Sequence, residues 1–162
     1  MAGEWWLGRD LDVGLVADGE GTVVAGPPTR LDLQALRRED VLPRTLDLGV
    51  AAERADLVQA LVLRLLTERG ELEGLGHRDY GSRHHALIGE PNTERVRARI
   101  KLYVLECLKQ EPRLERILGV DVRAGAGREN RDTVRISIRA QMKGQLDPLN
   151  LVVPFSLQGG PA

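Results

Sequence analysis

Hydrophobic residues recur at helical spacing between residues 51 and 67. One row of leucines lies beside a second apolar row, and together they form a stripe wide enough to face a core. The rows are Leu57, Leu61 and Leu65, and Val58, Val62 and Leu66. The pattern predicts a helix over residues 51–67, which Gly70 is placed to end as a left-handed C-cap.

A second helical segment follows Pro91. Asn92 and Thr93 are both able to cap its first turn. Apolar residues then recur at spacings of three and four, as Val96, Ile100, Tyr103, Val104 and Cys107. Pro112 lacks a backbone N–H and drives the residue before it out of the α region, so we expect this helix to run no further than Gln110.

Beyond that turn the pattern changes to strict alternation, which a helix would not produce. Over residues 134–142 the apolar side chains point one way and the polar ones the other. The apolar set is Val134, Ile136, Ile138, Ala140 and Met142. The polar set is Arg135, Ser137, Arg139, Gln141 and the following Lys143. Val120 and Val122 begin a partner strand, and Leu149, Leu151, Val153, Phe155 and Leu157 share one face of a last strand. Pro154 places part of that strand at an edge, because proline removes a ladder donor.

The first fifty residues carry weaker patterns. Residues 10–25 alternate around a turn at residues 18–21, which predicts a β-hairpin. A short helix fits residues 33–38, and Pro43 interrupts what precedes it. We expect residues 1–50 to form the hairpin and a variable extension, and residues 51–162 the main domain, as one structural unit. The predicted fold class is α+β, with two main helices packed on a small, mostly antiparallel sheet.

Composition and charge exclude several classes of function. The net charge of −1 argues against nucleic-acid binding as the main activity. The single cysteine, Cys107, excludes an internal disulfide and lies on the apolar face of a helix. No apolar run reaches the ~18 residues of a membrane span, and residues 1–12 lack a signal pattern, so we expect a cytoplasmic product. The polar strand face, with Arg135 and Arg139, is either simply solvated or a docking face for an acidic partner.

Candidate catalytic and metal-binding residues gather between residues 71 and 90. Glu71, Asp79 and Glu90 would serve a glycosidase only with a raised pKa and a sugar-binding cleft, and five aromatic residues offer little to stack on sugars. His77, His84 and His85 lack metal-ligand spacing, and Ser82 beside them does not make a triad. We expect a solvated loop cluster here, with no catalytic residue, metal or cofactor.

Five segments in a fixed order resemble one protein family. They are Leu65 to Glu71, Asp79 to Ser82, Gly89 to Thr93, Glu111-Pro112-Arg113, and Asp147 to Leu157. This order resembles the baseplate wedge, or sheath-initiator, family of contractile phage tails and related injection systems, some of whose members are labelled lysozyme-like. The resemblance covers roughly residues 52–157. Two departures are Leu75-Gly76-His77-Arg78, where the family loop often has a proline, and a long link at residues 26–50.

The resemblance implies a structural role without catalysis or cofactor. It implies that Glu111, Pro112 and Arg113 dock on a helical bundle of larger wedge subunits, with one copy in each of six wedges. It also implies that strands of the first sheath ring add to the sheet, and the candidate sheath-facing residues are Arg135, Arg139, Leu151, Val153 and Phe155. Hub or tube-proximal proteins are further candidate partners, whereas nucleic acid and membrane are not expected.

The same resemblance does not distinguish between two kinds of particle, a virion baseplate and a phage-tail-like apparatus, either of which would be assembled in the cytoplasm. A peptidoglycan-cleaving, lysozyme-like enzyme is the alternative function, and a nucleic-acid adaptor is a second. Because Glu111 and Arg113 flank a forced turn, we expect both to be exposed in the free protein and to pair only in the wedge.

Overall fold

The computed structural model describes residues 9–11, 16–17, 23–24, 35–37, 46–48, 50–125 and 131–158. Within these residues the α-helices are α1 (Arg54–Leu66) and α2 (Glu94–Leu108), and the 3-10 helices are η3 (Glu73–Leu75) and η4 (Arg83–Leu87). Neither α-helix has the length and apolarity that crossing a bilayer would require, within the described residues.

The main sheet runs in the order β2-β3-β9-β8-β7. Its long strands are β7 (Leu114–Ala124), β8 (Thr133–Met142) and β9 (Leu149–Ser156), and they pair antiparallel. The short strands β2 (Val16–Ala17) and β3 (Val23–Val24) extend it, and β3 runs parallel to β9. The predicted α+β class with a mostly antiparallel sheet is confirmed.

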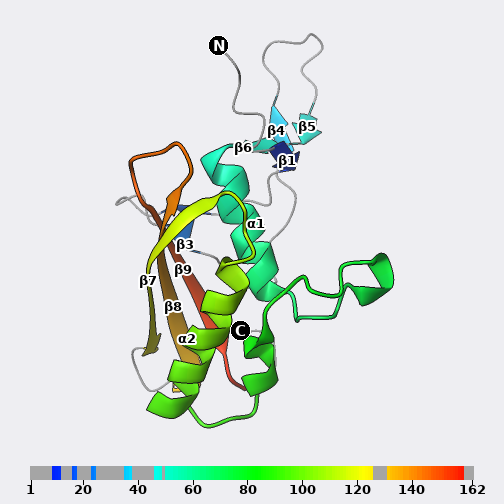
Figure 1. Cartoon of the computed structure of the whole chain (residues 1–162). Coiled ribbons are helices and arrows are strands. Elements are labelled where there is room, and N and C mark those ends of the chain that lie inside the picture. Colours follow the sequence, from blue (N-terminus) through cyan, green and yellow to red (C-terminus); the bar gives the residue numbers. More distant parts are fainter. Residues whose placement is uncertain are drawn as a thin grey trace.

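Both helices cover one face of this sheet, as Figure 1 shows. The alternation predicted for β8 places Ile136, Ile138 and Met142 in the core, each no more than 1% exposed. Leu57, Leu61 and Leu65 of α1 belong to the same core cluster and are fully buried, and burial of each such side chain stabilises the fold by about 1.5–3 kcal/mol.

Two helix boundaries follow local chemistry. Thr93 caps α2, because its side-chain oxygen accepts a hydrogen bond from the Val96 N–H at 3.3 Å. At the end of α1, Gly70 is not the C-cap that the sequence predicted. The helix ends at Leu66 and Thr67 becomes extended, while Gly70 takes its positive φ of 94° in the turn beyond.

The N-terminal strands correct one prediction and confirm part of another. The short helix predicted over residues 33–38 is wrong, because β4 (Ala35–Arg37) pairs antiparallel with β5 (Leu46–Leu48). The hairpin is confirmed where β2 meets β3, whereas β1 (Arg9–Leu11) pairs instead with β6 (Val50–Ala52). Residues 12–15, 18–22 and 38–45, with the predicted hairpin turn and Pro43, lie outside the described residues.

Pro154 has β8 on one side, and its predicted edge position stays a prediction because residues 25–34, which follow β3, lie outside the described residues. Its register partner on β8 is Arg135. On the other side β3 pairs with β9 only at Leu151 and Val152, within the part of the chain described.

Candidate functional site

The 111–113 turn, formed by Glu111, Pro112 and Arg113, joins the end of α2 to the start of β7. The Glu111 N–H donates to the Leu108 carbonyl at 3.1 Å, and the Leu114 N–H donates to the Glu111 carbonyl at 3.2 Å. The turn therefore stands between helix and strand, as predicted, and Pro112 is exposed on it.

Arg113 links this turn to α1 through two carboxylates. Its Nε lies 2.7 Å from Glu111 Oε1 and its Nη2 lies 3.3 Å from Glu111 Oε2, which is a bidentate pair. Its Nη1 donates to Asp56 Oδ2 at 2.7 Å. Burial opposes its charge, but the hydrogen bond and charge of Glu111, with the charge of Asp56, raise the pKa of Arg113 above its usual value.

The expectation that Glu111 and Arg113 are exposed and unpaired in the free protein is wrong. Glu111 is only 5% exposed and is already paired with Arg113. Its side chain turns back toward α1, where a buried carboxylate without a cation would be costly. Pro112 is thus the exposed part of a turn that buried charges hold in place.

Arg64 and Tyr80 border the same cluster. Arg64 Nη2 lies 3.8 Å from Glu111 Oε2, and its guanidinium carbon lies 4.6 Å from the centroid of the Tyr80 ring. Asp56, Arg64 and Tyr80 are not among the residues predicted to bind partners. Their link to the turn spans up to 57 positions, so no local pattern could reveal it.

The loop after α1 is fastened at its base by a close backbone approach. The Ser82 N–H donates to the Thr67 carbonyl at 2.9 Å, and the Arg69 N–H donates to the Ser82 carbonyl at 3.2 Å. Gly81 has a φ of 97°, and a Cβ there would lie 2.7 Å from the carbonyl oxygens of both Thr67 and Glu68. Only glycine fits this position.

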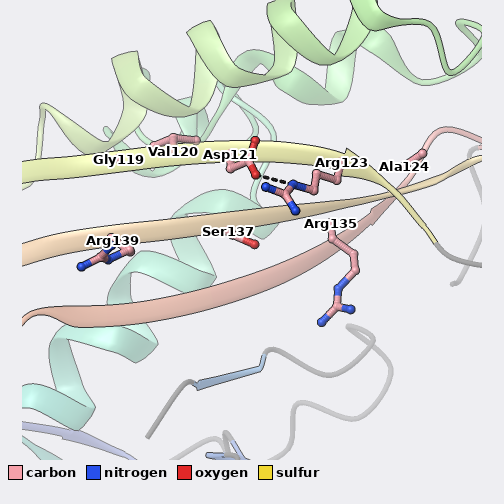
Figure 2. Close-up of a pocket in the computed structure, with 8 residues that line it drawn as sticks. All are labelled: Gly119, Val120, Asp121, Arg123, Ala124, Arg135, Ser137 and Arg139. Carbon is pink, nitrogen blue, oxygen red and sulfur yellow. Dashed lines mark hydrogen bonds and ion pairs between the residues drawn. The ribbon is translucent and has the colours of Figure 1, made fainter. Parts of the chain in front are cut away.

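The outer face of the sheet, opposite the helices, carries arginines around a hollow of about 640 Å³. Figure 2 shows Arg123 joined to Asp121, whereas the guanidinium groups of Arg135 and Arg139 point away from that pair. Arg123 and Arg135 are direct register partners, an arrangement of like charges that costs stability. Within the described residues, the side chains of Arg135 and Arg139 make no hydrogen bond or ion pair. We call the three arginines that border the hollow, Arg123, Arg135 and Arg139, the arginine face.

The other three candidate sheath-facing residues point the opposite way. Leu151, Val153 and Phe155 are at most 8% exposed and belong to the core. Their side chains therefore are not on the surface of the free chain. Among the strands that the structure describes, β7 is an outer strand of the sheet.

One of the three histidines, His84, is packed inside the fold, so the expectation of a solvated loop cluster is wrong for it. It is 1% exposed, its Nδ1 lies 2.7 Å from Ser82 Oγ, and its ring meets the edge of Phe155 at a centroid distance of 4.4 Å. Burial, together with the charge of His85, lowers the pKa of His84 to about 3. His85 Nε2 donates to the Leu65 carbonyl at 2.8 Å, and His77 is exposed.

Cys107 lies in the core as the sequence predicted, and burial raises the pKa of its thiol to about 11. No group of three or more metal-ligating side chains occurs in the described part of the chain.

The loop carboxylate Asp79 has the wrong environment for a general acid. It is exposed and lies 2.7 Å from Arg69 Nη2. The hydrogen bond and charge of Arg69 lower the pKa of Asp79, whereas a glycosidase acid needs a raised one.

Comparison with known proteins finds one matching family and a similar solved structure. Residues 51–146 match the family described as "Baseplate wedge protein gp25". A crystal structure from Geobacter sulfurreducens, of a protein provisionally named a tail lysozyme, is 25% identical with a TM-score of 0.54. That likeness covers 62% of this chain and 87% of the other. Among curated proteins none matches the chain.

Proposed function

Since the chain belongs to the family of baseplate wedge protein gp25 and is thus a structural baseplate component of a phage-tail type of particle, we propose that the 111–113 turn docks it onto a helical bundle of larger wedge subunits. One observation carries the proposal. Arg113 holds Glu111 and Asp56 together at 2.7 Å contacts, so Pro112 is presented on a turn that needs no ordering when it binds.

The burial of Glu111 decides how this docking is tested. Alanine at Glu111 or Arg113 would disturb folding as well as binding, because both belong to a buried ion pair. Pro112→Asp changes the exposed residue alone. We expect this variant to keep its melting temperature and to lose co-purification with the wedge subunits. Leu146→Asp, at a side chain 94% exposed elsewhere, is the control. Undiminished co-purification of Pro112→Asp would refute docking through the turn.

The sheet supplies the second part of the proposal, contact with the sheath. Strand addition uses the backbone of an open edge for affinity and flanking side chains for register. An outer strand, β7, with the arginine face beside it, supports such a role. Because Leu151, Val153 and Phe155 are buried, only Arg135 and Arg139 of the predicted sheath-facing side chains are available. The double variant Arg135→Glu/Arg139→Glu should fold normally and impair sheath initiation, and normal sheath number and length would remove this face from the proposal.

We further propose that the chain has no catalytic activity, although its Geobacter relative is named a tail lysozyme. The lowered pKa of Asp79 supports this, since it keeps that carboxylate charged where acid catalysis needs a proton. Purified protein should leave the turbidity of a peptidoglycan suspension unchanged. A loss of turbidity that Asp79→Asn abolishes would establish the enzyme instead.

The resemblance to the family, rather than the geometry, implies how the chain is assembled. On that ground we propose one copy in each of six wedges and assembly in the cytoplasm, with hub or tube-proximal proteins as further neighbours. The pairing of β1 with β6 and of β3 with β9 supports residues 1–50 and 51–162 acting as one unit.

A further inference from the structure

Arg64 is a partly buried cation, with a side chain 16% exposed and one donor atom that lacks a partner. Its Nε is the one buried side-chain nitrogen or oxygen without a hydrogen-bond partner among the residues described. Its remaining polar contacts are long, at 3.4 Å from Nη1 to Gln110 Oε1 and 3.8 Å from Nη2 to Glu111 Oε2. Leaving such a donor unsatisfied is unfavourable, and the guanidinium retains capacity for an acceptor that the described residues do not provide.

A groove of about 310 Å³ opens beside Arg64. It lies between the loop before Gly81 and the end of α2, and residues lining it include His77, Arg78, Tyr80 and Gln110. Asp79 also lines it, but that carboxylate is engaged with Arg69 at 2.7 Å. The remaining charged groups at this groove are the cations Arg64 and Arg78. Gln110 lines the groove and is adjacent in sequence to the 111–113 turn, so the groove lies near the turn.

We propose that this groove binds a carboxylate side chain, a glutamate or aspartate on a helix of a partner wedge subunit, and that Arg64 is its principal ligand. This rests on the proposed docking of the 111–113 turn and names the chemistry that recognises the partner. Guanidinium and carboxylate match in a planar, bidentate geometry. The Tyr80 ring, 4.6 Å from the guanidinium carbon, holds the cation while the carboxylate enters.

Arg83 is a matched control on the same molecule. Its Nη1 lies 3.6 Å from Glu106 Oε2, and its guanidinium carbon lies 4.8 Å from the centroid of Tyr103. Arg83 thus has one weak ion pair and one aromatic contact, as Arg64 has, but it does not line this groove. If binding depended only on the total positive charge, replacing Arg64 or Arg83 by glutamine would weaken it equally.

The test measures the affinity of the full chain for the wedge subunits of its own particle, for wild type, Arg64→Gln, Arg64→Lys, Arg83→Gln and Pro112→Asp. We expect Arg64→Gln to bind roughly tenfold or more weakly, Arg64→Lys to be intermediate, and Arg83→Gln to match wild type. If Arg64→Gln binds like Arg83→Gln while Pro112→Asp fails, the carboxylate site is refuted and docking stands. If Pro112→Asp also binds normally, both proposals fail.

A second measurement needs no variant that might misfold. The N–H group at Nε of each arginine gives its own NMR signal, and sodium acetate serves as the carboxylate probe against sodium chloride at equal ionic strength. We expect acetate to shift the Arg64 signal in a saturable way and the Arg83 signal no more than chloride does. Equal shifts in both salts, or none at Arg64, would overturn the proposal.

Discussion

Arg113 and Asp56 are separated by 57 positions in the sequence, yet Arg113 Nη1 donates to Asp56 Oδ2 at 2.7 Å. This bond fastens the turn after α2 to the first turn of α1. The same guanidinium also binds Glu111, so two carboxylates share one arginine and form a cluster with it. The surface proposed to meet the wedge is therefore built on a buried structural element.

The first prediction concerns the stability of this cluster. Arg113→Ala removes the nearest cation from the buried Glu111 and Asp56 and leaves only the more distant Arg64 beside Glu111, so the free energy of unfolding should fall by about 3–5 kcal/mol. Arg123→Ala removes an exposed pair with Asp121 and should change it little. Urea unfolding of both variants makes the comparison. Equal effects of the two substitutions would show that the cluster contributes no more than a surface ion pair.

The second prediction concerns pH. His84 has a folded pKa of about 3, below the usual histidine value of 6.5, because burial disfavours the charged ring. Between these values the unfolded chain binds more protons than the folded one. Stability should therefore be full above pH 6.5 and fall as the pH drops toward 3, by up to about 1.4 kcal/mol per pH unit.

The control for this pH dependence is His77→Gln, since His77 is exposed and should contribute little to it. His84→Gln removes the titrating ring and should flatten the dependence, even if it lowers stability at neutral pH. Urea midpoints measured across the acid range provide the data. A dependence that persists unchanged in His84→Gln would assign it to other groups.

The third prediction uses two glycines with nearly equal backbone angles. Gly70 and Gly81 have φ values of 94° and 97°, but a Cβ at Gly70 meets nothing within 4 Å. Gly70→Ala should cost only the backbone strain, about 1–2 kcal/mol. Gly81→Ala adds a clash with two backbone carbonyls and should cost clearly more in thermal unfolding. Equal losses would mean that the loop base can shift to make room.

The main domain could be predicted from the sequence because its signals are local. The alternation through β8 identified the buried row from Val134 to Met142, and Thr93 with Pro112 marked the limits of the region containing α2. Both kinds of signal depend on near neighbours along the chain.

The misses have one physical origin, since each depends on contacts between distant residues. Residues 35–37 form a strand because residues 46–48 pair with them. The residue types at these positions suit a helix and do not reveal that pairing. Glu111 is buried because Asp56 and Arg113 meet beside it, and His84 because Phe155 packs against it. The forced turn at Pro112 had predicted exposure of Glu111, and the loop setting had predicted exposure of His84.

Photo-crosslinking from two positions tests most directly the central claim that two surfaces meet two different partners. A benzophenone amino acid replaces Pro112 in one variant and Arg135 in another, and both are assembled into particles. The account predicts that position 112 crosslinks to a larger wedge subunit and that position 135 crosslinks to the sheath protein. If position 112 reaches no wedge subunit, or both positions reach the same protein, the account is contradicted.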